Sequence, residues 1–197
     1  MKIGIIGAGA IGTTIAKHLT EAGYNIIISN SRGADTLTEK VKQIGGNIVA
    51  GSVQHAAEAD VIFLAVRWEN AQEALSAINL KGKILVDVTN GSVPEFDRGE
   101  PGSKTSSELV SQWAKGAKVV KAFNTLFANV LAKDPKVDGG NRVLFYSGDY
   151  ADAKEAVLGI INKIGFAGVD LGSLHEGGKL QRFPGGPLPT LNLIKLK

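Results

Sequence analysis

The sequence predicts an α/β fold with a doubly wound, mostly parallel sheet of about eight strands and a short C-terminal extension. Short apolar runs alternate with stretches of helical spacing, and this alternation implies parallel strands joined by right-handed crossovers. A glycine-rich turn from Gly7 to Gly12 joins the first apolar run to the first helical stretch. We therefore expect one domain over residues 1–173 and an extension over 174–197.

The strands are predicted from apolar runs, and the helices from apolar spacing between capping residues and glycine stops. The run 61–66 is apolar throughout, which is typical of a strand covered on both faces. Thr105 and Glu108 have the spacing of a capping box at a helix start. The predicted strands are 2–6, 25–29, 47–50, 61–66, 84–88, 118–123, 142–146 and 166–170, and the predicted helices are 10–22, 37–44, 52–59, 71–78, 105–115, 125–132 and 153–164.

Three segments are expected to lack regular structure. Residues 90–104 and 134–141 are predicted to be loops, because they are polar and contain glycine and proline. From Leu174 onward, closely spaced prolines and a Gly185-Gly186 pair argue against helix and strand. Since the same segment is rich in leucine, we expect it to pack over the sheet or into a partner subunit.

The composition is that of an ordinary globular protein. Hydrophobic residues make up 44% and charged residues 21% of the chain, and the net charge is +3. The basic residues are scattered and not interleaved with aromatics, which argues against nucleic-acid binding. No apolar run approaches the length of a membrane span, and the start of the chain lacks a clear signal-peptide pattern, so a cytoplasmic protein is expected.

Metal and cysteine chemistry are not expected. The chain has no cysteine, which excludes disulfides, thiolate metal sites and a cysteine nucleophile. The three histidines, His18, His55 and His175, are far apart in sequence and lack metal-ligand spacing. We therefore predict no metal site.

The glycine-rich turn has the spacing of the dinucleotide-binding fingerprint of Rossmann folds. Gly7 permits the sharp turn, Gly9 lets the backbone approach a pyrophosphate, and Gly12 lets the helix pack closely on the strand. Ala10 and Ile11 open the helix, whose free N–H groups and dipole favour phosphate binding. A purely structural glycine turn is the alternative interpretation.

The end of the second predicted strand indicates which dinucleotide is bound. Proteins that bind NAD usually carry Asp or Glu there to hold the ribose hydroxyls, whereas this chain has Asn30, Ser31 and Arg32. A hydroxyl and a guanidinium attract a ribose phosphate, which a carboxylate would repel. We therefore predict NADP(H), the alternative being that Ser31 and Arg32 belong to a solvated loop.

Ligands of this fold lie beyond the carboxyl ends of the strands, which selects further candidate cofactor residues. Small or neutral residues at these ends suit the nicotinamide half of the cofactor. Arg67 could contact a phosphate or remain solvated, and Trp68 could stack on a ring or cover the next helix. The candidates are Ala65, Val66, Arg67, Asn90, Gly91, Asn124 and Thr125.

No catalytic residue can be assigned from the sequence. Hydride transfer to a carbonyl normally needs a nearby proton donor, and no convincing Tyr, His or Lys stands out. His175 and Lys179 are weak candidates, because too little chain follows them for the helical domain of 3-hydroxyacid dehydrogenases. A conjugated ring acceptor needs little from side chains, so the sequence favours transfer between two ring cofactors.

Four segments of the chain are distinctive in combination: Gly7–Gly12, Ser31-Arg32, 121–125 (Lys-Ala-Phe-Asn-Thr) and 185–188 (Gly-Gly-Pro-Leu). With these segments, and over nearly its whole length, the chain resembles the small NADPH-dependent F-420 reductases, whose dinucleotide domain also occurs in the STEAP metalloreductases. The resemblance implies NADP(H) binding, hydride exchange with deazaflavin (coenzyme F-420) or with FMN or FAD, and a homodimer. The residues matching Gly9–Gly12 would hold the pyrophosphate, and those matching Ser31 and Arg32 the ribose phosphate. Val66 and Asn124 would line the nicotinamide region.

The chain departs from the archaeal enzymes of this family in its shorter C-terminal segment. This leaves the small-molecule acceptor open between deazaflavin and flavin. A non-catalytic NADP(H) sensor, or a module that binds a partner, is the main alternative. A small-carbonyl reductase would need an acid–base residue that the sequence does not offer.

Overall fold

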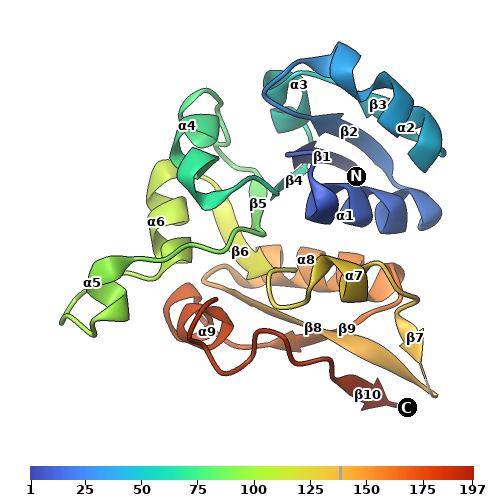
Figure 1. Ribbon diagram of the computed structural model, residues 1–197. Coiled ribbons are helices and arrows are strands. Elements are labelled where there is room, and N and C mark those ends of the chain that lie inside the picture. Colours follow the sequence, from blue (N-terminus) through green and yellow to red (C-terminus); the bar gives the residue numbers. More distant parts are fainter. Residues whose placement is uncertain (138) are drawn as a thin grey trace.

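The computed structural model describes residues 1–137 and 139–197. Its sheet contains parallel strands in the order β3-β2-β1-β4-β5-β6 (Figure 1). Connections run in one direction from β1 to β3 and in the other from β4 to β6, which is the doubly wound arrangement and confirms the predicted fold class. These strands are β1 (Lys2–Ile6), β2 (Asn25–Ser29), β3 (Ile48–Ala50), β4 (Val61–Leu64), β5 (Ile84–Asp87) and β6 (Lys118–Ala122).

The sheet continues past β6 with antiparallel pairing. β8 (Gly140–Gly148) is antiparallel to β6, and β9 (Ala167–Asp170) is parallel to β8. Two short strands, β7 (Lys136–Val137) and β10 (Ile194–Leu196), pair with the beginning of β8. The predictions of a loop at 134–141 and an irregular tail were therefore wrong in part. Both segments adopt strand structure because they satisfy backbone groups of the long strand β8.

Most helices lie close to their predicted positions. They are α1 (Ala10–Glu21), α2 (Thr38–Ile44), α3 (Val53–Ala57), α4 (Ala71–Ser76), α6 (Ser106–Trp113), α7 (Ala128–Leu131) and α8 (Ala151–Lys163). Two 3₁₀ turns, η1 (Ala34–Leu37) and η2 (Trp68–Asn70), precede α2 and α4. The predicted 90–104 loop contains one extra helical turn, α5 (Pro94–Asp97), which lies on a projecting segment (Figure 1). Its proline stands in the first turn, where no backbone donor is lost.

The prediction that regular structure stops at Leu174 was wrong, because α9 spans Leu174–Gln181. The Ser173 hydroxyl caps this helix by accepting from the Glu176 N–H at 3.1 Å. A Cβ at Gly177 would lie 2.1 Å from the Ser147 side chain, so the glycines of the helix permit close packing on β8. Glycines that usually argue against a helix are here required by the packing.

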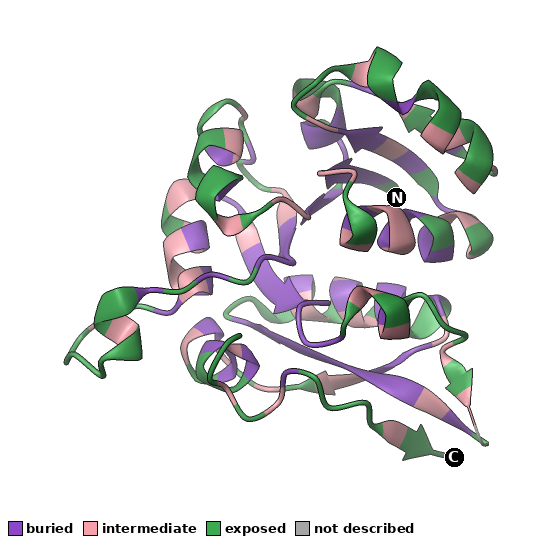
Figure 2. Ribbon diagram, viewed as in Figure 1, coloured by how far each residue is buried: buried purple, intermediate pink, exposed green. Residues whose placement is uncertain are grey.

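Alternating residues of the strands face two separate apolar cores. On β4, Phe63 packs in the core beneath α1 and α8, while Ile62 and Leu64 pack in the core beneath α3, α4 and α6. The central strands are accordingly buried and the outer helix surfaces exposed (Figure 2). This two-sided burial explains the continuous apolar run at 61–64. In the ranges that the structure describes, no helix has both the length and the apolarity to cross a membrane.

Candidate dinucleotide site

The turn after β1 has a geometry that only glycine tolerates at two of its positions. Gly7 has φ of 112°, and its N–H donates to the Ser29 carbonyl at 2.9 Å. A Cβ at Gly7 would lie 2.3 Å from the Ala65 carbonyl oxygen, and a Cβ at Gly12 would lie 2.0 Å from the Gly7 carbonyl oxygen. A Cβ at Gly9, by contrast, would meet no described atom within 4 Å. Gly7 and Gly12 therefore bring α1 close to the strands, while Gly9 faces open space.

The start of α1 leaves backbone donors available beside Gly9. Gly9 is the N-cap residue, and no side chain in the described part of the chain caps this end. The first N–H groups of a helix have no partner within the helix, and they carry the positive end of its dipole. This end therefore suits a bound anion.

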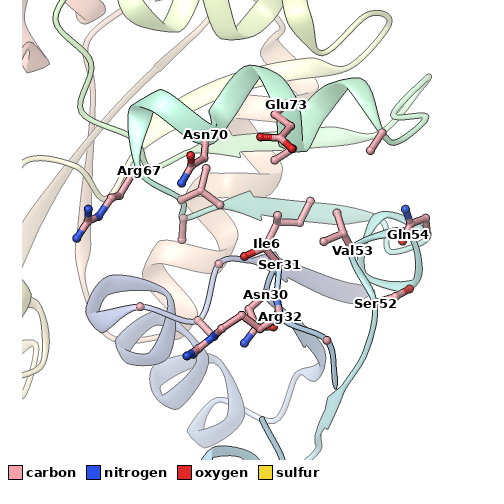
Figure 3. A pocket seen from close by; sticks show the side chains of 18 of the residues that line it. Ile6, Asn30, Ser31, Arg32, Ser52, Val53, Gln54, Arg67, Asn70 and Glu73 are labelled. Carbon is pink, nitrogen blue, oxygen red and sulfur yellow. Dashed lines mark hydrogen bonds between the residues drawn. The ribbon is translucent and has the colours of Figure 1, made fainter. Parts of the chain in front are cut away.

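A cleft of about 710 Å³ opens over the carboxyl ends of β1, β2 and β4 (Figure 3). Asn70 and Glu73 border it on one side, and Asn30, Ser31 and Arg32 border it on the opposite side. Other residues that line the cleft come from the segment after β3 or from α4. The complete lining is Ile6, Gly7, Ala8, Gly9, Asn30, Ser31, Arg32, Gly33, Ala34, Ser52, Val53, Gln54, Ala65, Val66, Arg67, Asn70, Glu73, Ala74 and Ala77.

The Asn30 side chain holds the loop after β2 through hydrogen bonds. These bonds involve the backbone of Arg32 and not its guanidinium. The Asn30 side chain accepts from the Arg32 N–H at 3.0 Å and donates to the Thr36 hydroxyl at 2.9 Å. Among residues 1–137 and 139–197, no carboxylate forms an ion pair with Arg32; the nearby Asp35 lies within the following 3₁₀ turn. An exposed guanidinium at the rim of a cleft can bind a phosphate bidentately.

A second cleft of about 490 Å³ adjoins the first and shares Gly9 and the segment 65–67 with it. Its walls combine apolar and polar side chains, and the ionisable residues among its lining are Arg67 and Glu69. Trp68 lies directly over Gly91, where a Cβ would be 2.3 Å from the indole ring. The complete lining is Gly9, Ala10, Ile11, Ala65, Val66, Arg67, Trp68, Glu69, Val88, Thr89 and Asn90.

Hydrogen bonds to Asn124 hold the Asn90 side chain in place at the second cleft. The Asn124 side chain donates to the Asn90 side-chain oxygen at 2.9 Å, and the Asn90 amide donates to the Asn124 carbonyl at 3.2 Å. Asn124 also contacts Gln181, the last residue of α9. The C-terminal helix thus reaches the back of the second cleft.

A buried ion pair supports the neighbouring turn at the end of β5. Lys121 donates to Asp87 at 3.1 Å and to the Thr89 carbonyl, and both charged side chains are almost completely buried. Asp87 also accepts from the hydroxyls of Thr89 and Ser107, each at 2.7 Å. The charges are therefore paired and their hydrogen-bonding capacity is used, as burial requires.

Most of the residues predicted from the sequence line the two clefts. Gly7 and Asn30 to Arg32 border the first cleft, Ala10, Ile11 and Asn90 border the second, and Gly9 and 65–67 border both. Gly12, Gly91, Asn124 and Thr125 are not among the residues that line either cleft. Sequence reasoning did not predict several residues that line the first cleft, among them Ser52–Gln54 after β3 and Glu73 and Ala74 on α4. The strand-end rule could have indicated 52–54, because it applies to β3 as well.

His175 and Lys179 lie outside both clefts, on α9. His175 contacts Glu108 at 3.1 Å, and Lys179 pairs with Glu176 at 3.0 Å. Burial alone would raise the pKa of Glu108, but hydrogen bonds from Thr105 and His175 outweigh burial and lower that pKa below its ordinary value. Within the described residues, no group of three or more metal-ligating side chains is found.

Glu108 should stabilise the fold at neutral pH but not in acid. Because its folded-state pKa lies below the ordinary value of 4.5, its stabilisation is present above that value and lost as the pH falls through the folded pKa. Glu108→Gln should cost about 0.3–1 kcal/mol near neutrality at the start of α6 and much less near pH 3. Urea unfolding at both pH values measures this, with the exposed Glu155→Gln as control. An equal loss at both pH values would show that the charge of Glu108 is not responsible.

Comparison with known proteins relates the chain to NADP-dependent reductases. Residues 2–91 match the family model described as NADP oxidoreductase, coenzyme F420-dependent. Rat metalloreductase STEAP3 is 30% identical over 192 residues, covering 96% of the chain and 37% of the relative. Mouse metalloreductase STEAP2 is 25% identical, covering 93% of the chain and 36% of the relative. The chain thus spans little more than a third of the length of these curated relatives.

Solved structures extend the comparison to the whole chain. A hypothetical protein from Sinorhizobium meliloti has 43% identity and a TM-score of 0.89, with coverage of 99% of this chain and 96% of that one. A putative F420-dependent NADP reductase from Arthrobacter sp. FB24 has 26% identity and a TM-score of 0.70, with coverage of 88% and 86%. A reductive aminase from Aspergillus terreus, at 20% identity and a TM-score of 0.65 over 89% of this chain and 56% of that one, shows likeness of fold alone.

Proposed function

Since the chain belongs to the family of coenzyme F420-dependent NADP oxidoreductases and STEAP dinucleotide domains, we propose that it binds NADP(H) and transfers hydride between NADPH and a deazaflavin or flavin ring. The observation that carries the nucleotide part is the cleft bordered by Ser31 and Arg32, with no carboxylate paired to that arginine in the described residues. A ribose phosphate complements a hydroxyl beside a guanidinium.

The residues that line the two clefts fit a dinucleotide in an extended arrangement. The open space at Gly9 and the uncapped start of α1 suit the pyrophosphate. Asn30, Ser31 and Arg32 would hold the ribose phosphate in the first cleft. Residues 65–67 and Asn90 would hold the nicotinamide half in the second cleft.

The residues that line the second cleft favour a conjugated ring over a carbonyl as the hydride acceptor. When bound, NADPH supplies a hydride, which is one proton with two electrons, to the acceptor ring. That ring takes one more proton from water. Of the residues that line this cleft, none is Tyr, His or Lys, the usual proton donors to a carbonyl. The contribution of the chain is therefore to align two ring systems.

Arg32→Ala tests the nucleotide assignment. Loss of a charge-assisted contact should weaken NADPH binding by about 1.5–3 kcal/mol, roughly 10- to 150-fold in dissociation constant. NADH, which lacks the phosphate, should be affected far less. Calorimetric titration of each nucleotide measures the difference, with Arg98→Ala as control because Arg98 is exposed and paired with Glu100. If both nucleotides weakened equally, Arg32 would not recognise the phosphate.

Turnover separates the enzyme from the alternative function. The same lack of acid–base residues fits a non-catalytic NADP(H) sensor, which would bind NADPH without oxidising it. Loss of NADPH absorbance with FMN, FAD or deazaflavin would support the reductase. Tight NADPH binding without turnover of any ring would support the sensor.

Two further properties of the protein are proposed, the first on the family resemblance and the second on the sequence pattern alone. We expect a homodimer, which light scattering can measure, and a location in the cytoplasm.

A further inference from the structure

The C-terminal helix ends on a side chain that is completely buried between β8 and the second cleft. Gln181 has no exposed surface, although glutamine is rarely found fully buried. We propose that Gln181 is a positioning residue, which fixes Asn124 and through it the Asn90 wall of the second cleft. The inference rests on the proposed function, because it takes this cleft to hold the nicotinamide half of NADP(H).

Every polar atom of the Gln181 side chain has a partner. Its amide nitrogen donates to the Asn124 side-chain oxygen at 3.2 Å and to the Phe145 carbonyl at 3.3 Å. Its side-chain oxygen accepts from the Ser147 hydroxyl at 2.8 Å. Turning the amide over would place its nitrogen against the hydroxyl and its oxygen against two other oxygens. The partners on β8 therefore dictate the orientation of Gln181.

The orientation of Gln181 dictates that of the two asparagines. Because the Asn124 side-chain oxygen accepts from Gln181, its nitrogen is directed to the Gln181 carbonyl at 2.8 Å and to the Asn90 side-chain oxygen at 2.9 Å. The Asn90 nitrogen then donates to the Asn124 carbonyl at 3.2 Å. Ser147 on β8 is thus linked through two amides, those of Gln181 and Asn124, to Asn90, which lines the second cleft.

The backbone at the same place is held in an unfavourable conformation. Phe123 and Thr190 are the non-glycine residues with positive φ in the described chain, at 65° and 73°. Phe123 precedes Asn124, and the Thr190 N–H donates to the Thr125 carbonyl at 2.7 Å. Such conformations persist only where the surroundings enforce them, and here the C-terminal segment supplies the contacts. This indicates that the segment holds the end of β6 in its position.

The network contacts one cleft and not the other. Asn90 lines the second cleft, whereas Asn90, Asn124 and Gln181 are all absent from the lining of the first, which Arg32 borders. Loss of the Gln181 hydrogen bonds should therefore weaken binding of the nicotinamide half and leave binding of the adenosine half unchanged. General destabilisation of the fold would affect both halves.

Gln181→Met keeps the size of the side chain and removes its hydrogen bonds. Calorimetric titration compares NADPH with 2′,5′-ADP, which carries the adenosine and its ribose phosphate but no nicotinamide. NADPH should bind about 10-fold more weakly, as expected for lost hydrogen bonds, and 2′,5′-ADP should bind within about 2-fold of wild type. Gln43→Met on the exposed face of α2 is the matched control and should bind both probes as wild type does.

Two further variants serve different purposes. One tests whether the effect passes through Asn90, and the other replaces Gln181→Met if that variant does not fold. If the effect passes through Asn90, Asn90→Ala should weaken NADPH about 10-fold in wild type but less than about 3-fold in the Gln181→Met background. If Gln181→Met does not fold, Ser147→Ala removes only the hydroxyl that donates to the Gln181 side-chain oxygen. It should weaken NADPH binding about 3-fold while leaving 2′,5′-ADP binding unchanged.

The outcomes separate this inference from the proposed function. NADPH weakened and 2′,5′-ADP unchanged, with non-additive Asn90 and Gln181 effects, supports the inference even if no ring acceptor turns over. Normal NADPH binding in the variant, equal weakening of both probes, or additive effects would overturn it while leaving the proposed function standing. A wild-type protein that binds neither probe would overturn both.

Discussion

Gly9→Val should abolish detectable NADPH binding while the protein remains folded. A side chain at this position projects into open space, since even its Cβ would meet no described atom within 4 Å. The added methyl groups would occupy the place proposed for the pyrophosphate beside the start of α1. Loss of two charge-assisted hydrogen bonds would cost about 3 kcal/mol or more, at least 100-fold in dissociation constant.

The control is Gly159→Val, the same substitution at an exposed position of α8 where a Cβ also meets no described atom. Calorimetry measures binding, and circular dichroism with thermal unfolding verifies the fold. Both variants should unfold close to wild type, and only Gly9→Val should lose the nucleotide. Normal NADPH binding by folded Gly9→Val would show that the pyrophosphate lies elsewhere.

Lys121→Met should destabilise the protein by about 3–5 kcal/mol, because it leaves the Asp87 carboxylate buried without its counter-charge. Asp87 has no exposed surface, and the Lys121 side chain is only 2% exposed. The variant also removes the donor to the Thr89 carbonyl at the rim of the second cleft. Unfolding in urea measures the loss.

Two comparisons isolate the ion pair. Lys115→Met, at an exposed position after α6, should leave the unfolding midpoint nearly unchanged. Adding Asp87→Asn to Lys121→Met removes the unpaired charge and should restore part of the lost stability. A loss below about 1 kcal/mol in Lys121→Met would mean that water or structural relaxation solvates Asp87.

The sequence predicts the parallel half of the fold well, because local patterns there agree with the tertiary structure. The apolar run at 61–64 is a strand buried on both faces, and Gly7 and Gly12 stand where a Cβ cannot fit. Glycine spacing, strand periodicity and the strand-end rule all indicate the same edge of the sheet. Most of the predicted cofactor residues consequently line the two clefts.

The C-terminal segment could not be predicted in the same way, because long-range packing decides its structure. Gly177 and Gly178 weaken the helical pattern of α9, yet they allow the helix to contact Ser147 and Thr105. The strands β7 and β10 have few residues, and they exist because β8 offers partners along its first residues. Such pairing leaves no periodic signal in the short partner.

The depth of buried polar side chains could not be predicted for a related reason. Asn124 was predicted to line the nicotinamide region; in the structure its side chain is hydrogen-bonded to Gln181 and Asn90 and lines neither cleft. The sequence position of Asn124 at the end of β6 indicates the correct edge of the sheet but not the depth of the side chain. Gln181 lies far along the chain and carries no local signal.

Titration of the wild-type protein with NADPH and with NADH in the same buffer tests phosphate recognition at Ser31 and Arg32 most directly. We expect NADPH to bind at least about 10-fold more tightly, a difference of roughly 1.4 kcal/mol or more, and the preference to shrink as salt screens the exposed guanidinium. Equal dissociation constants for the two nucleotides, or no binding heat from either, would contradict it.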